Sequence, residues 1–426
     1  MKQLILAVTA LVFSINAHAQ LTLEDCQKKA RTHYPEIAQY DLISQSEQYN
    51  LESASRSWIP QITLSAQATW QNAVPSFPDQ MNTMLETLGM DLPGIPKDQY
   101  RVALDVSQTI WDGGLSKANK AVAKADAAEK RLSSDVSIYS IEERINSIFF
   151  SILLLDENLA TLRAKQELLE SNYRKLEAMH RGGAVLKSDL DLVRVEQLSL
   201  GQTLEQTEAS RQSFVSMLEM FIGEALDGRH LEKPALSLLP DLDVRRPELQ
   251  LLDAKIARLD AQEELLGTSL TPRFAFFAQG YYGNPGLDMF KSMTSRDWTW
   301  NAIVGIRMQW NVSSLFTYGA DRRKLDNARR SLLIQRDVFS FNSSLQTSRE
   351  SSEILRMRSA LDSDNEIVDL RANIRRTAES QRENGVIDTA TLLQRITEES
   401  AAVTARNIHE IELLKTVYEL KHTVNQ

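Results

Sequence analysis

Residue types that most often carry chemistry are sparse in this chain and lie far apart. The histidines are His18, His33, His180, His230, His409 and His422. None of them has the H-E-x-x-H spacing that brings two imidazoles onto one zinc ion. The single cysteine, Cys26, excludes an intrachain disulfide and a C-x-x-C motif. The sequence also lacks a glycine-rich phosphate loop and a G-x-S-x-G nucleophile motif, so these residues predict no catalytic site.

One acidic segment, 362–366, has part of the pattern of a calcium loop. Ile367 stands where the glycine of such a loop should follow, and the closing glutamate is missing, so we interpret the segment as a solvated helix face. Two Arg-Arg pairs, at 245–246 and 375–376, are most simply surface charge. The net charge of −9 argues against nucleic acid as a partner. We therefore predict that the protein is not an enzyme and has no metal and no cofactor.

The N-terminus has the pattern of a secretory signal peptide. Lys2 precedes an apolar run over 4–15, and Ala17-His18-Ala19 forms an A-x-A cleavage site. The run is shorter than the ~20 residues that a membrane-spanning helix needs. The pattern predicts a signal peptide over 1–19 and export from the cytoplasm.

The most regular stretch of the mature chain runs from Trp298 to Trp310. Every second residue is apolar, while the residues between them, among them Gly305, are polar or small with the exception of Ile303. A period of two predicts a β-strand with one apolar and one wet face. At ~3.3 Å per residue the stretch is about 40 Å long, and tryptophans at both ends of the apolar face are typical of an outer-membrane barrel strand.

Three further segments alternate in the same way, so four strands are predicted. Their expected ranges are about 61–71, 100–111, 273–282 and 298–310. All six tryptophans lie in or beside these strands, and none lies in the long helical regions. Tryptophan collects at membrane–water interfaces. We predict that the interface aromatics are Trp70, Trp111, Trp298, Trp300 and Trp310.

The rest of the chain reads as long helices. Residues 115–181 contain neither glycine nor proline, and their apolar residues recur at alternating steps of three and four. This heptad pattern predicts a helix of about 100 Å that packs along its length against other helices. Gly182-Gly183 ends it, a returning helix is expected over 188–221, and 223–246 reads as a linker.

The second half of the chain repeats the order of the first. Pro35-Glu36-Ile37 recurs as Pro247-Glu248-Leu249, Pro60 recurs as Pro272 at the same separation, and Gly385 corresponds to Gly183. We therefore divide the mature chain into a first repeat, 20–222, the linker, and a second repeat, 247–426. Each repeat has the order helix, strand, strand, helix, helix.

The duplicated order resembles that of the TolC-type outer-membrane efflux proteins. The strand exit over 108–114 and the glycine turns that lead into Ser188-Asp189-Leu190 and Thr391-Leu392-Leu393 carry this resemblance. It implies a mainly α fold with a membrane β-barrel, in which three chains each contribute four strands and their helices form a coiled-coil α-helical barrel. Four strands cannot close on themselves, and an open sheet edge cannot lie in lipid, so a shared barrel is also expected on physical grounds. The homotrimer itself is implied by the resemblance.

The function that follows is an outer-membrane channel, with porin-like activity, of a tripartite efflux or export system. It would be a passive conduit for small molecules or polypeptides, and its partners would be a periplasmic adaptor protein, an inner-membrane transporter and outer-membrane lipid. We expect it in the outer membrane of a Gram-negative cell, with the helical body in the periplasm. The alternative is a structural or adhesive coiled-coil protein of the envelope. The sequence does not distinguish substrates or proton-driven from ATP-driven pumps.

Two groups of candidate site residues lie around the glycine turns. The resemblance implies an adaptor-docking tip made of Gly183, Ala184, Leu190, Gly385, Val386 and Leu392. For the two leucines, packing within the helical body is a competing use. The resemblance also implies a periplasmic gate, but the positions that are acidic in well-known members of the family are Thr391 and Gln394 here, and Arg382 replaces an aromatic residue. We therefore expect a weakly acidic gate, for which Asp388 and Asp189 are the remaining acidic candidates.

Overall fold

The computed structural model describes residues 21–89, 94–226, 228–236 and 240–425. The expected signal peptide, 1–19, lies outside this part of the chain. The chain divides into two compact units, each built from segments of both halves of the sequence. Residues 41–130 and 252–333 form one unit, here called the sheet unit. Residues up to 40, 131–251 and from 334 onward form the other, here called the helical unit.

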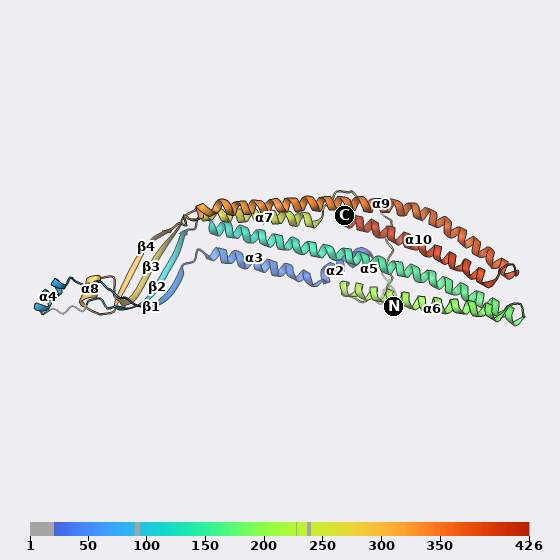
Figure 1. Cartoon of the computed structure of the whole chain (residues 1–426), viewed down its shortest axis with the longest axis horizontal. Helices are drawn as coiled ribbons and strands as arrows, with labels where there is room; N and C mark the ends of the chain where they lie inside the picture. The colour runs from blue at the N-terminus through green and yellow to red at the C-terminus, as the bar shows by residue number, and fades with distance from the viewer. Residues whose placement is uncertain (1–20, 90–93, 227, 237–239, 426) are drawn as a thin grey trace, which may run out of the picture. The chain divides into compact units, whose positions relative to one another are not determined.

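The sheet unit contains one antiparallel four-stranded sheet (Figure 1). Its strands are β1 (Gln61–Trp70), β2 (Asp98–Trp111), β3 (Arg273–Asn284) and β4 (Thr299–Gln309). The strands follow one another in the order β1-β2-β3-β4, so β1 and β4 are both edges. The loop between β1 and β2 contains helix α4 (Asp79–Thr87), and the loop between β3 and β4 contains α8 (Met289–Thr294).

The register places apolar side chains in rows across one face of the sheet. One such row pairs Ile62 with Val106, and Ala278 with Val304. The next row toward the loops pairs Leu64 with Leu104. Because the side-chain period of a strand is two, the residues between these rows all lie on the other face. That second face, here called the polar face, carries the Thr, Ser, Gln and Arg side chains of the alternating pattern.

Long helices make up most of the remaining chain. The longest are α5 (Leu115–Arg181), α6 (Lys187–Ile222), α9 (Ser314–Glu383) and α10 (Thr389–Val424). Shorter helices are α2 (Leu23–His33), α3 (Gln39–Arg56), α7 (Pro247–Gly267) and the 3-10 segments η1 (Pro35–Ala38) and η2 (Thr268–Leu270). The glycine- and proline-free stretches are helical because nothing in them breaks the backbone hydrogen-bond pattern.

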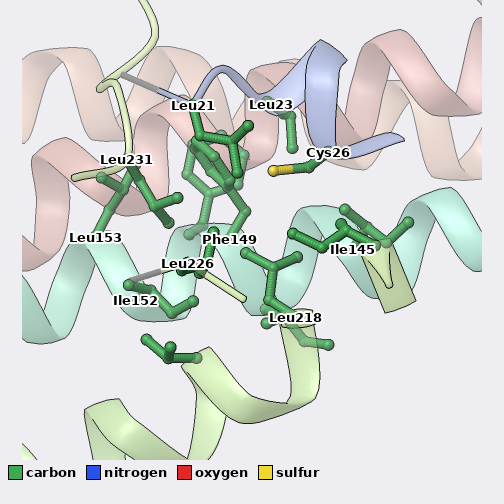
Figure 2. Close-up of a cluster of buried hydrophobic side chains, with 14 of the residues drawn as sticks. Leu21, Leu23, Cys26, Ile145, Phe149, Ile152, Leu153, Leu218, Leu226 and Leu231 are labelled. Carbon is green, nitrogen blue, oxygen red and sulfur yellow. The ribbon is translucent and has the colours of Figure 1, made fainter. Parts of the chain in front are cut away.

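The main core of the helical unit gathers around α5 (Figure 2). Ile145, Phe149 and Ile152 of α5 are fully buried and pack with residues of α2, α6 and α10. Cys26 of α2 belongs to the same cluster, and burial raises the pKa of its thiol to about 12. A thiol that is buried and protonated is unreactive, so Cys26 serves as a core residue.

By length and composition, one helix in the described part of the chain, α5, contains a stretch apolar enough to cross a membrane. Its apolar side chains are used elsewhere, because the most apolar turns of α5 lie in the core of the helical unit. Burial against other helices accounts for these core residues, and 39% of the apolar stretch is buried.

Candidate functional site

The two glycine turns end α5 and α9 in the same way. Gly183 and Gly385 both adopt the left-handed conformation, with φ of +73° and +72°. The next amide reaches back across the last turn of each helix: Ala184 N donates to the carbonyl of Met179 at 2.9 Å, and Val386 N to that of Gln381 at 2.8 Å. This is a Schellman cap, which satisfies the terminal carbonyls and needs a residue without a Cβ penalty at the glycine.

Acidic side chains begin both returning helices. The Asp388 carboxylate accepts from the Thr391 amide at 2.8 Å and caps α10. Hydrogen bonds from the side chain and backbone of Thr391 lower the pKa of Asp388. Asp189 accepts from the Leu186 amide at 3.2 Å at the start of α6. Both gate candidates therefore have a capping role, because an anion is stabilised by the free amides of a helix N-terminus.

Arg382 connects two helical hairpins of the helical unit, one formed by α9 and α10 and the other by α5 and α6. Its Nε and Nη2 donate to the hydroxyl of Thr389 at 3.1 and 3.0 Å, and Nη2 lies 3.9 Å from a carboxylate oxygen of Asp189. The Arg382 side chain is only 12% exposed. It therefore ties α9 to the start of α10 and to the start of α6. The other two gate candidates differ in exposure, since Thr391 is half-buried and Gln394 is exposed and donates to Glu398.

The two leucines assigned to the docking tip are core residues. Leu190 is 8% and Leu392 4% exposed, and both belong to a cluster with Leu169 and Ile396. This burial corrects their assignment as contact residues. Their side chains lie on the helix faces that pack against the neighbouring helices of the cluster. The competing use, packing within the helical body, is the one that the structure supports.

A small exposed apolar surface remains at the turns. Val386 is 69% and Leu186 72% exposed, and Gly183, Ala184 and Gly385 are exposed as well. The sequence pattern does not indicate Leu186, because this residue lies between Gly183 and the start of α6, outside any periodic pattern. We call Val386 and Leu186 together the tip surface.

Two other sequence interpretations change in part. Arg246 and Arg375 are not simple surface charge. Arg246 pairs with Glu248 and lies over the rings of Tyr139 and Phe339, while Arg375 pairs with glutamates of α9 and α10. The acidic segment 362–366 lies inside α9, and no group of His, Cys, Asp or Glu in the described residues could hold a metal ion.

The aromatic residues of the sheet unit form two groups on or beside the apolar face. At the loop end, Tyr282 packs against Trp298 and Trp300 at centroid distances of 5.3 and 5.0 Å. At the helix end, Trp111 packs against Phe274 at 5.9 Å, and the indole of Trp310 donates to the carbonyl of Leu270 at 3.2 Å. The remaining predicted interface residue, Trp70, ends β1 at the loop end and is 70% exposed.

The apolar face between these groups is open to solvent. Val304 and Ile306 are 69% and 70% exposed, and Leu64 is 73% exposed. A contiguous exposed apolar surface of this kind marks a surface that meets another apolar phase.

These features define a class of fold: long antiparallel helices and a four-stranded sheet whose two faces differ in polarity. Similar solved structures include the outer membrane protein VceC of Vibrio cholerae, with 14% identity, a TM-score of 0.67 and 94% of each chain covered. The Campylobacter jejuni CmeC outer membrane channel has 12% identity and a TM-score of 0.67, over 94% of this chain and 85% of CmeC. The open state of the Neisseria gonorrhoeae MtrE outer membrane channel has 13% identity and a TM-score of 0.64, over 94% and 88%.

No protein-family model and no curated protein sequence matches the chain. The likeness to the solved structures confirms the expected fold class, which is mainly α with a four-stranded sheet domain.

Proposed function

We propose that the protein is an outer-membrane channel, a passive conduit through which solutes leave a Gram-negative cell. The observation that carries this proposal is the sheet of the sheet unit. It exposes a continuous apolar face, and within the described residues the outer edges of β1 and β4 pair with no other strand. In water such a sheet would aggregate, whereas in a bilayer its apolar face would be solvated by lipid.

The two free edges, β1 and β4, indicate that further copies of the chain complete the sheet. Unpaired backbone groups cost several kcal/mol each in hydrocarbon, so β1 of one copy must pair with β4 of the next until the sheet closes. Two copies would give eight strands, an interior that side chains fill, while three would give twelve and leave a lumen. We therefore infer a homotrimer in which the polar face lines the lumen.

The distance between the aromatic groups fits this placement. Trp300 and Trp310 are ten residues apart, so they are about 33 Å apart along an extended strand. With the tilt of roughly 40° that is usual in membrane barrels, this distance projects to about 25 Å along the membrane normal. That is the height of the apolar band of an outer-membrane barrel.

The proposed partners follow from the strand loops and from the glycine turns. The two strand loops would face the exterior, and the helices would lie in the periplasm. The tip surface would meet a periplasmic adaptor protein, which would connect the channel to an inner-membrane transporter that supplies the energy. The proteins with the same fold are described as outer membrane channels, which supports the channel but leaves the cargo, small molecules or polypeptides, to be determined.

The test is the behaviour of the purified protein. Outer-membrane fractions should contain a species that migrates as a trimer in mild detergent and as a monomer after heating, and this species should give conductance steps in a planar bilayer. A soluble coiled-coil protein would not fractionate with the outer membrane, and a structural or adhesive protein would give no conductance; either result would refute the proposal.

A further inference from the structure

The polar face of the sheet carries an excess of positive charge. Its charged residues are Arg101, Arg273 and Arg307 against one carboxylate, Asp105. All three arginines are exposed, while Asp105 is half-buried. Every other residue of this face is neutral, so each copy of the chain contributes a net charge of about +2 to it.

The contacts of the three arginines do not neutralise their charge. Arg101 lies over the ring of Tyr281 at 5.4 Å and donates to the amide oxygen of Gln67 at 3.4 Å. Arg307 lies over the ring of Phe277 at 4.7 Å. A cation–π contact holds a guanidinium without neutralising it. No ion pair to any of the three arginines is present among the residues that the structure describes.

The one carboxylate does not offset this charge where it is most concentrated. Asp105 accepts a hydrogen bond from the Gln279 amide in the middle of the sheet. Arg273 pairs with Gln309, and Arg307 with Ala275, so the two arginines are diagonal neighbours on the same face. The backbones of diagonal neighbours in a sheet lie about 7–8 Å apart, so both cations belong to one part of this face, where no counter-charge is described.

We propose that the barrel lumen selects for anions, so that the favoured solutes are small organic anions that carry a carboxylate, sulfonate or phosphate group. This inference rests on the proposed function, because it takes the polar face as the lining of a shared barrel. Three copies bring nine guanidinium groups and three carboxylates to one ring of strands. A lumen with an excess of one sign of charge and a low-dielectric wall focuses the field and raises the local concentration of the opposite ion.

The experiment is the reversal potential of the reconstituted trimer under a potassium chloride gradient. We expect the permeability ratio of chloride to potassium to exceed one. In the triple variant Arg101→Gln, Arg273→Gln, Arg307→Gln this ratio should fall about twofold or more, because the focusing charge is removed while the side chains stay polar and nearly as long. Asp105→Asn is the matched control of opposite sign, and it should raise the ratio.

The outcomes separate this inference from the proposed function. A wild-type protein that forms no conducting trimer refutes the channel itself. A conducting trimer that prefers potassium, or whose ratio is unchanged by the arginine substitutions, overturns the anion selectivity and leaves the channel intact. If the triple variant fails to assemble, Arg307→Gln alone serves, because that side chain makes no described hydrogen bond; its ratio must still fall, and an unchanged ratio counts against the inference.

Discussion

Arginine substitutions at two adjacent positions of β4 test which face of the sheet meets lipid. Val304 is 69% exposed on the apolar face, and it lies within one residue of the midpoint between Trp300 and Trp310. An arginine at the midplane of a barrel costs about 2–4 kcal/mol. Since 1.4 kcal/mol is a factor of ten, Val304→Arg should reduce the folding equilibrium constant by about 30-fold to several hundredfold.

Ile303→Arg is the matched control. Ile303 is also β-branched, differs by one position along the strand, and points to the opposite face, where it pairs with Gln279 in the row of Asp105. A cation there faces water and a carboxylate, so we expect a change within about 0.5 kcal/mol. Gly305, which neighbours Val304 on the other side, is unsuitable as a control, because a Cβ there would lie 2.9 Å from the Phe277 ring.

The assay is the amount of heat-modifiable trimer in outer-membrane fractions, followed by urea titration of the protein refolded into bilayers. Val304→Arg should give little trimer and a lower urea midpoint, and Ile303→Arg should give both at the wild-type level. Equal losses in the two variants would refute the assignment of the faces, and a larger loss for Ile303→Arg would reverse it.

Four further predictions concern the loops and the helical unit. Val386→Asp, on the exposed tip surface, should abolish efflux from a sensitised strain at a normal level of trimer. Leu392→Asp should instead lower the trimer level, because it places a charge in a core. Normal efflux by Val386→Asp would show that the turn is only a helix cap. A tag inserted near Gln80 should be labelled on intact cells and one at Gly183 should not; labelling of both would refute the topology. Trivalent cations should block conductance from the periplasmic side only weakly, because the acids at the turns already cap helices and one of them lies near an arginine; strong, pH-dependent block would show that those acids form the ring after all. Finally, burial raises the pKa of Glu350 above its usual value, so the charge of Glu350 lowers stability at neutral pH and this cost disappears as the pH falls. Glu350→Gln should therefore raise Tm at pH 7.5, and the difference from the wild type should close near pH 4. A difference that stays constant with pH would argue against a titration effect.

Local patterns predicted the elements of this fold well. The four strands lie close to the expected ranges, because alternation of apolar and polar residues is a strong signal of a strand with two different faces. The long helices follow from the lack of glycine and proline, and both glycine turns lie where left-handed glycine is needed.

Contacts between segments that are distant in the sequence could not be predicted from it. A heptad pattern shows that Leu190 and Leu392 are apolar and periodic, but it does not say whether they face a partner protein or the neighbouring hairpin. The position of the Phe277 ring against Gly305 depends on the register of two strands. The bonds from Arg382 to Thr389 join positions that are close only after the second turn has formed.

The two free edges of the sheet also have a genetic consequence. If three copies complete one barrel, no copy can function or fail alone, and a defective chain is incorporated together with sound ones. In a cell that makes equal amounts of both, only about one trimer in eight would consist entirely of wild-type chains, as random assortment into a closed ring of three requires. A substitution at the tip surface or in the lumen that leaves assembly intact should therefore behave as dominant-negative. One that blocks pairing of β1 with β4 removes its chain from the pool and should be recessive.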